Sequence, residues 1–153
     1  MSELLDETDR KILRLLQNDA TLSMDSLADQ VHLSRNACWR RVRQMEQSGV
    51  ITAKVALADP AKLAHGQSVI VLLRAGSHTP DWLEQFERAV QTLPEIVGAY
   101  RTSGDLDYVL RVRVADVQDY DRFYQTLIRR VPIANVSASF VMEELKETTA
   151  IPV

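Results

Sequence analysis

The chain has 153 residues, of which 46% are hydrophobic and 25% charged, and its formal net charge is −3 at pH 7. These values suit one globular domain or two small ones and argue against a protein that coats nucleic acid by bulk positive charge. No apolar run approaches the ~20 residues of a membrane span, the acidic start lacks the pattern of a secretory signal, and a single cysteine excludes an internal disulfide. We therefore expect a cytoplasmic protein without a membrane partner.

The first third of the chain predicts three helices. Residues 9–18 carry aliphatic side chains at helical spacing, and residues 23–31 form a second, short helix. A tight link leads to a third helix, with Ser34 as its N-terminal cap and Gly49 as its terminator. A short helix, a tight turn and a second capped helix form the helix-turn-helix pattern, whose second helix enters the major groove of DNA.

The third helix has two unlike faces. Cys38, Val42 and Met45 share one side, which we expect to be buried, with Cys38 as a small core residue rather than a redox group. The opposite side carries side chains that can read adenine and guanine edges in bidentate fashion. The helix start is better placed for phosphates. The candidate DNA-binding residues are Asn36, Arg40 and Arg43 in the groove and Ser34 and Arg35 at the phosphates.

Three points about this helix stay open. A basic helix face can also be a solvated surface, although the helix-turn-helix context favours DNA binding. Trp39 can pack on a deoxyribose or cover the edge of the core, and we favour the core. Arg41 lies toward a flank, where it can simply pair with an acidic side chain.

The remaining chain predicts a wing and a second domain. Residues 50–57 are rich in β-branched side chains and predict a strand or β-wing, which makes residues 1–59 a winged helix-turn-helix domain. A partly helical connector opens the second domain, residues 60–153. Its predicted strands are 68–75, 96–102, 108–114 and 136–145, and its helices begin at Pro80 and after Asp116. The inward residues of these helices are expected to be Trp82, Leu83, Phe86, Ala89, Val90 and Leu93 on the first, and Val117, Tyr120, Phe123, Tyr124, Leu127 and Ile128 on the second.

The predicted order, βαββαβ, defines a ferredoxin-like domain and an α+β protein. Both helices would cover one face of the sheet, yet apolar residues occupy both faces of the predicted strands. We therefore expect a homodimer joined sheet to sheet. A two-fold dimer would present two recognition helices to a palindromic site.

Four segments, in order and spacing, resemble the Lrp/AsnC (leucine-responsive/asparagine regulator) family of transcription factors. They are residues 5–13, 33–51, 103–108 and 141–144, and the last two also resemble the cysteine-sensing branch. The resemblance implies binding of double-stranded operator DNA, homodimers that assemble to octamers, and a leucine- or cysteine-like amino acid effector in clefts between the ferredoxin-like domains. His32 stands where the family usually has glycine, and Arg35 where proline is frequent. Because histidine tolerates positive φ better than most residues, the turn at His32 can take a less usual conformation.

The loop at residues 102–108 is the candidate effector site. A free amino acid needs an acceptor for its ammonium group and donors for its carboxylate, and this loop offers both. The residues alone favour a simple hairpin turn, whereas the resemblance favours a binding loop. The candidate effector residues are Thr102, Ser103, Gly104, Asp105, Asp107 and Tyr108, with Ser139 contributed by a neighbouring subunit; Tyr108 can instead fill core.

Two other functions are less well supported. An amino-acid-metabolising enzyme could use Asp105 and Asp107 as an acid/base pair, but no Ser/His/Asp or Cys/His constellation, phosphate-binding glycine loop or Cys/His metal cluster accompanies them. We expect no catalytic residue, no metal and no cofactor besides the effector. A DNA-architectural protein would differ only in lacking an effector. The sequence thus predicts a regulator whose DNA binding or assembly responds to an amino acid.

Overall fold

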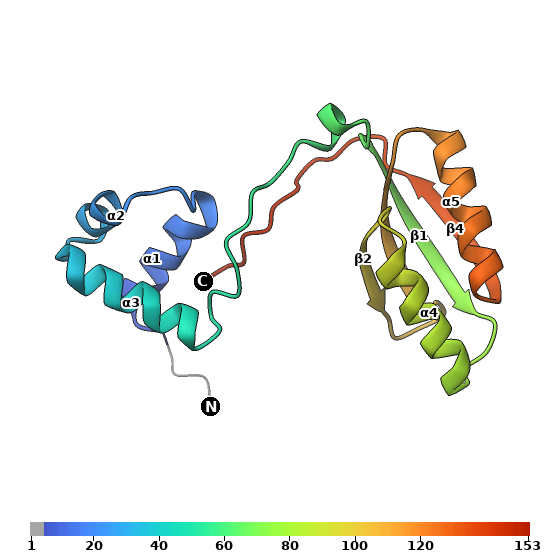
Figure 1. Cartoon of the computed structure of the whole chain (residues 1–153), viewed down its shortest axis with the longest axis horizontal. Helices are drawn as coiled ribbons and strands as arrows, with labels where there is room; N and C mark the ends of the chain where they lie inside the picture. The colour runs from blue at the N-terminus through green and yellow to red at the C-terminus, as the bar shows by residue number, and fades with distance from the viewer. Residues whose placement is uncertain (1–4) are drawn as a thin grey trace. The chain divides into compact units, whose positions relative to one another are not determined.

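The computed structural model describes residues 5–153 as two compact units (Figure 1). The helical unit consists of the chain up to Leu57 together with the C-terminal segment Lys146–Val153, and the sheet unit is Ala58–Leu145. The return of the last eight residues to the helical unit was not predicted. Within the described residues, no helix combines the length and hydropathy of a membrane span.

The helical unit contains the three predicted helices. They are α1 (Glu7–Asn18), α2 (Met24–Val31) and α3 (Arg35–Gln47). Each begins at a side-chain cap that accepts a backbone N–H: Asp6 for α1, Ser23 for α2 and Ser34 for α3. Their apolar stripes meet in one core, made of Ile12, Leu13, Leu27, Ala28, Val31, Cys38, Val42 and Met45. The predicted buried face of the third helix is therefore confirmed.

The predicted strand at residues 50–57 is wrong. This segment has no strand assignment, and every residue in it except Ile51 is exposed. Its one backbone anchor near the helix is the bond from the Ile51 N–H to the Met45 oxygen, 3.0 Å long. β-Branched composition favours an extended backbone, but a strand also needs a neighbour to accept its ladder of hydrogen bonds.

The sheet unit has the predicted βαββαβ order. After a short 3-10 helix (Pro60–Leu63), its elements are β1 (Gln67–Ala75), α4 (Pro80–Thr92), β2 (Ile96–Arg101), β3 (Tyr108–Val114), α5 (Val117–Arg130) and β4 (Ile133–Phe140). The strands lie in the order β2-β3-β1-β4 with every neighbouring pair antiparallel, which confirms the ferredoxin-like arrangement. β4 begins three residues earlier and ends five residues earlier than expected, although the Val141 N–H still donates to the Ser68 oxygen at 2.9 Å.

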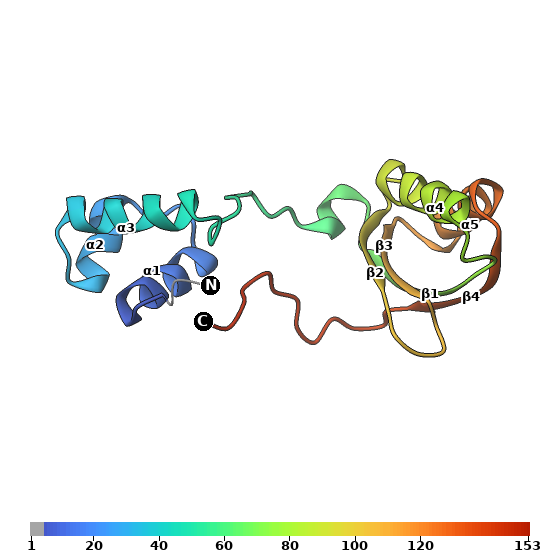
Figure 2. The ribbon, with the colours of Figure 1, turned by 90° about the horizontal axis from the view of Figure 1, so that it is seen from below.

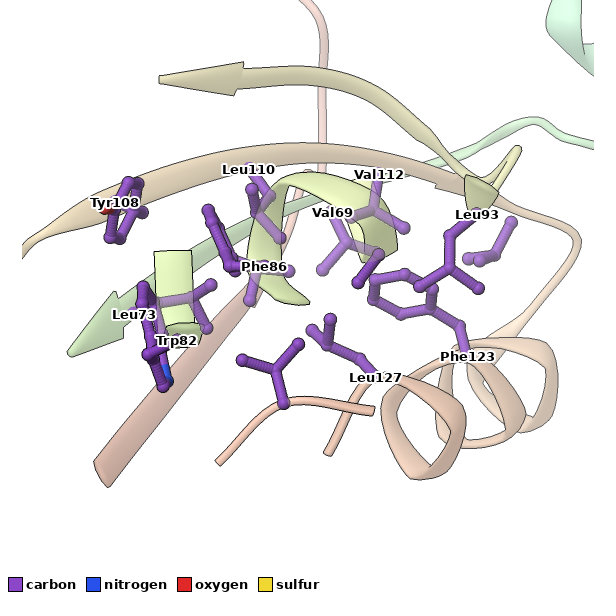
Figure 3. Close-up of a cluster of buried hydrophobic side chains, with 14 residues drawn as sticks. Val69, Leu73, Trp82, Phe86, Leu93, Tyr108, Leu110, Val112, Phe123 and Leu127 are labelled. Atoms are coloured by element: carbon purple, nitrogen blue, oxygen red, sulfur yellow. The ribbon is translucent and has the colours of Figure 1, made fainter. Parts of the chain in front are cut away.

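Both helices of this unit cover the same face of the sheet (Figure 2). Between helices and sheet lies a core in which Trp82 and Phe86 stack with ring centroids 5.1 Å apart, beside Leu110 and Leu127 (Figure 3). Two expected core residues are exposed instead: Leu83 by 39% and Val117 by 63%. Both lie at the edge of the apolar stripe of their helix, where a small rotation decides between core and solvent.

The other face of the sheet carries apolar side chains that no element of the unit covers. Leu72 lies next to the buried Leu73 on β1 and so points to this open face, where its strand neighbours are Val109 and Ser137. Leu72 and Val109 are partly exposed, and Tyr100, opposite Val109 on β2, is 51% exposed. The pairing shifts register twice, between Ile96 and Gly98 on β2 and between Arg74 and Ala75 on β1.

Candidate nucleic-acid interface and ligand-binding loop

The outer face of α3 carries the residues predicted to meet DNA. Asn36, Arg40 and Arg43 are all exposed. At the helix start, the Ser34 hydroxyl accepts the Ala37 N–H at 3.2 Å, so its oxygen is already used in the cap. The Arg35 guanidinium lies 3.5 Å from the Asp25 carboxylate.

The two central arginines differ in their surroundings. Within residues 5–153, Arg40 makes no ion pair, whereas Arg43 lies 3.2 Å from the Glu46 carboxylate. The other oxygen of Glu46 accepts a 2.8 Å bond from Lys54. The hydrogen bond from Lys54 and the charges of both cations lower the pKa of Glu46, so this carboxylate is ionised at neutral pH. Arg40 is thus free to bind an anion, while Arg43 and Lys54 share one carboxylate.

Trp39 is 52% exposed, so the expectation that it covers the core is wrong. The Arg43 guanidinium lies over its ring at 5.6 Å from the centroid, which holds the indole on the outer surface. Together with Met24, Val42, Glu46 and Lys54, these two residues line a surface pocket of about 230 Å³. The outer side of α3 therefore offers a flat aromatic surface beside its guanidinium groups.

Arg41 of α3 pairs with two acidic side chains at the start of α1. Its Nη1 atom donates to Asp6 at 2.7 Å and to Asp9 at 2.8 Å, which confirms the expected pairing with acidic groups. The pKa of Asp6 is lowered, first by the hydrogen bond from the Asp9 N–H and then by that from Arg41. Arg41 thereby joins the middle of α3 to the start of α1.

The turn between α2 and α3 depends on His32. Its φ of 56° and ψ of 43° are left-handed, the conformation that glycine adopts at low cost. Its N–H bonds to the oxygens of Ala28 and Asp29 and closes α2. Histidine therefore takes the positive φ at this turn that the sequence allowed for.

The loop between β2 and β3 uses several of its polar groups internally. Thr102 donates its hydroxyl to the Leu106 oxygen at 2.6 Å and its N–H to the Asp107 oxygen at 2.9 Å. The Asp107 carboxylate accepts the Ala75 N–H at 2.8 Å and lies 3.9 Å from the His78 ring. Ser103 and Asp105 at the tip are exposed, and Gly104 between them has a φ of 127°.

The other two candidate effector residues lie away from this tip. Tyr108 is buried, and its ring packs 4.4 Å from that of Phe86, so it fills core. Ser139 is exposed on the open face, beside Ile70. Val136 of β4 is paired through Leu73 with Tyr108, where the loop ends. Ser139 lies three residues further along β4 than Val136, which at strand spacing is a distance of roughly 10 Å. A single chain does not bring Ser139 to the loop.

Among the described residues, no group of three or more His, Cys, Asp or Glu side chains could hold a metal ion. An exposed recognition helix on a small three-helix unit and a separate α/β unit together define a two-domain, DNA-binding regulator.

Comparisons with known proteins identify its family. Residues 5–52 match the winged helix-turn-helix DNA-binding model, and residues 68–151 match the Lrp/AsnC ligand binding domain. The glutamate uptake regulatory protein of Zymomonas mobilis is 48% identical over 97% of this chain and 90% of its own length. The DNA-binding transcriptional activator DecR of Escherichia coli is 42% identical over 98% of this chain and 99% of its own length.

The solved structures agree. An AsnC family transcriptional regulator from Agrobacterium tumefaciens has a TM-score of 0.93 at 48% identity, covering 97% of both chains. A transcriptional regulator from Neisseria meningitidis, solved as a complex with L-Met, has a TM-score of 0.92 at 31% identity, covering 97% of this chain and 96% of its own. The chain belongs to the Lrp/AsnC family of DNA-binding transcriptional regulators. Because its relatives are regulators and not enzymes, the alternative of an amino-acid-metabolising enzyme is wrong.

Proposed function

We propose that this protein binds a palindromic operator through α3, with Asn36, Arg40 and Arg43 at base edges. Ser34 and Arg35 lie at the start of the helix, where phosphate contacts are expected. The observation that carries this proposal is the exposed Arg40 guanidinium, which has no ion pair in the described part of the chain. An exposed guanidinium group without an ion-pair partner can bind a guanine edge or a phosphate without first breaking another contact.

The test is a double substitution, Arg40→Ala with Arg43→Ala, measured by fluorescence anisotropy on a palindromic duplex selected from random DNA. Two bidentate contacts at ~1–3 kcal/mol each predict a loss of at least ~30-fold, with unchanged circular dichroism. The matched control replaces Arg88 and Arg122, exposed arginines of the sheet unit that pair with acids on their own helices. Wild-type affinity in the double variant would refute the assignment of this face.

The open face of the sheet supports a homodimer. Leu72, Val109 and Tyr100 form an apolar stripe there without a covering helix, and burial of such a stripe by a second sheet is favourable. Assembly to octamers is the further expectation for this family. Leu72→Asp should shift the mass measured by light scattering toward the monomer, whereas Val117→Asp on the outside of α5 should not. An unchanged mass for Leu72→Asp would place the dimer contact elsewhere.

We further propose a small amino acid, leucine- or cysteine-like, as the effector, acting in the cytoplasm where operator DNA lies. The L-Met complex of the Neisseria relative supports an amino acid of this size. The exposed groups at Ser103, Gly104 and Asp105 supply donors and an acceptor, and Ser139 on the open face would join them from a second subunit. Thr102 and Asp107 shape the loop from behind.

A thermal-shift screen of the twenty amino acids against the purified protein identifies the effector. Asp105→Asn should then weaken binding of the amino acid that raises the melting temperature, because the ammonium group loses a charged acceptor. A ligand can change DNA binding only by its differential affinity for two states of the protein. If no amino acid alters melting, assembly or DNA affinity, the protein is a DNA-architectural factor instead.

A further inference from the structure

The C-terminal segment Lys146–Val153 is part of the helical unit, although it follows the last strand of the sheet unit. Three hydrogen bonds attach its end to α1. The Gln17 carboxamide makes two of them, donating to the Ile151 oxygen at 3.0 Å and accepting the Ile151 N–H at 2.7 Å. Arg14 donates to the Val153 oxygen at 2.8 Å. Gln17 thus binds both main-chain groups of one residue, as a neighbouring strand would.

The side chains of this segment have unequal roles. Val153 is partly buried against the aliphatic core of the helical unit, whereas Ile151 is 70% exposed. The main chain of Ile151 is bound but its side chain is not, and the apolar anchor is Val153. Arg14 is itself held by Glu7, whose carboxylate lies 3.0 Å from its guanidinium. The surface on α1 therefore combines a bidentate amide, a positioned guanidinium and an apolar edge.

The chain just before this segment is held on the sheet unit. The Val141 N–H donates to the Ser68 oxygen at 2.9 Å, which continues the line of β4 beside β1. Glu144 then pairs with Arg113 at 2.7 Å, and the Arg113 side chain is only 13% exposed. The chain enters the sheet unit at Ala58 and leaves it at Leu145, so a bound tail connects the helical unit to both ends of the ligand-binding domain.

We propose that Arg14, Gln17 and the part of the helical-unit core against which Val153 packs form a binding surface. This surface binds the chain's own C-terminal segment, Ile151–Val153. This segment acts as a strap, a second tether between the DNA-binding and ligand-binding domains. A domain held by two short connections samples fewer orientations than one held by a single extended linker. The strap therefore limits how far the DNA-binding heads of an assembly can be turned to meet two half-sites. This last step rests on the proposed function, because it requires a dimer on a palindromic site.

Hydrogen exchange on the full-length protein tests the binding surface without DNA or effector. The Ile151 amide should exchange slowly in the wild type and at least ~10-fold faster in Gln17→Ala and in Val153→Asp. Ile151→Ala removes an exposed side chain but keeps the bound main chain, and Lys11→Ala changes an exposed position of α1; both should retain the protection. An Ile151 amide that exchanges at the unprotected rate in the wild type would overturn the proposal.

A cysteine pair then tests which copy supplies the segment. Cysteines placed at Gln17 and Ile151 in the Cys38→Ser background should form a disulfide within one chain, giving a monomer on a denaturing gel. A covalent dimer would assign the surface to the tail of a second copy and overturn the tether.

Spacing of the half-sites tests the tether itself. A selected palindromic duplex is compared with one carrying ~5 additional base pairs, a half turn, between its half-sites. The wild type should lose ~10-fold or more on the longer duplex, because its two heads cannot engage together, and Gln17→Ala should lose clearly less. Equal losses in both proteins would exclude a limiting strap, whereas failure of the wild type to select any duplex would count against the proposed function instead.

Discussion

Glu46 pairs with two cations on the face of the helical unit that we propose meets DNA. One carboxylate holds Arg43 at 3.2 Å and Lys54 at 2.8 Å, so it offsets part of the positive charge that these two cations present to the surroundings. Glu46→Gln keeps the size of the side chain and removes its charge. We expect tighter binding to non-specific duplex DNA, because up to two cations become available.

The salt dependence gives this effect a magnitude. Each new phosphate contact steepens the slope of log K against log salt by about 0.9, so the two freed cations predict a change of about 0.9 to 1.8. The gain in affinity over the wild type should therefore shrink by about 3.5-fold per contact between about 50 and 200 mM salt. Preference for the selected palindrome should fall, since non-specific binding rises and Arg43 loses the group that orients it.

Fluorescence anisotropy on a scrambled duplex across this salt range measures both quantities. Glu84→Gln is the matched control, because Glu84 also pairs with an arginine at 2.8 Å, but in α4 of the sheet unit. An unchanged slope, or weaker non-specific binding, would refute the idea that Glu46 withholds charge from DNA.

Three further changes test the helical unit. The pKa of Asp6 is lowered in the folded state, so the ionised carboxylate stabilises the fold fully above the unfolded pKa of about 3.9 and loses this contribution as the pH falls through the folded pKa. Asp6→Asn should therefore lower the melting temperature at pH 7. The melting temperature of this variant should also decline less steeply in acid. Cys38 is fully buried and its pKa is raised by burial, so Ellman's reagent should label it only as the unit unfolds, and fast labelling of the native protein would contradict that placement. His32→Gly should raise the free energy of unfolding in urea by about 0.5–1 kcal/mol by relieving the left-handed backbone, and a decrease would show that the imidazole makes a larger contribution.

Local chemistry explains why much of the fold could be predicted from the sequence. Ser23, Ser34, Thr79 and Asp116 each cap a helix with a side-chain oxygen that accepts an N–H three residues on, a signal contained in a few adjacent letters. The βαββαβ order follows from changes in apolar periodicity along the chain. The exposed face of α3 could also be predicted, because Ser34 and Cys38 fix the rotation of that helix.

The errors arose where particular contacts, and not local composition or periodicity, decide the outcome. Residues 50–57 have the composition of a strand but no neighbour to form a ladder with. The Trp39 ring lies on the outer surface, where the Arg43 guanidinium contacts it. Helical spacing alone does not show whether a side chain at the edge of the apolar stripe packs on the core or on the surface. Gln17 and Ile151 are 134 positions apart, so nothing near either residue signals their pairing. The turn between β2 and β3 could be predicted as a segment, but the internal hydrogen bond of Thr102 depends on the oxygen of Leu106.

The register shifts in the sheet affect whether two copies of it can pair edge to edge. β2 and β4 are the border strands, and their outer backbone groups could template another chain. The register shift between Ile96 and Gly98 twists the edge strand β2, and the shift between Arg74 and Ala75 disturbs the pairing of β1 with the edge strand β4. Edge-to-edge pairing of sheets would form an open-ended ribbon, whereas face-to-face packing of sheets closes after a fixed number of subunits. These two register shifts therefore make edge-to-edge pairing of this sheet with another chain less favourable.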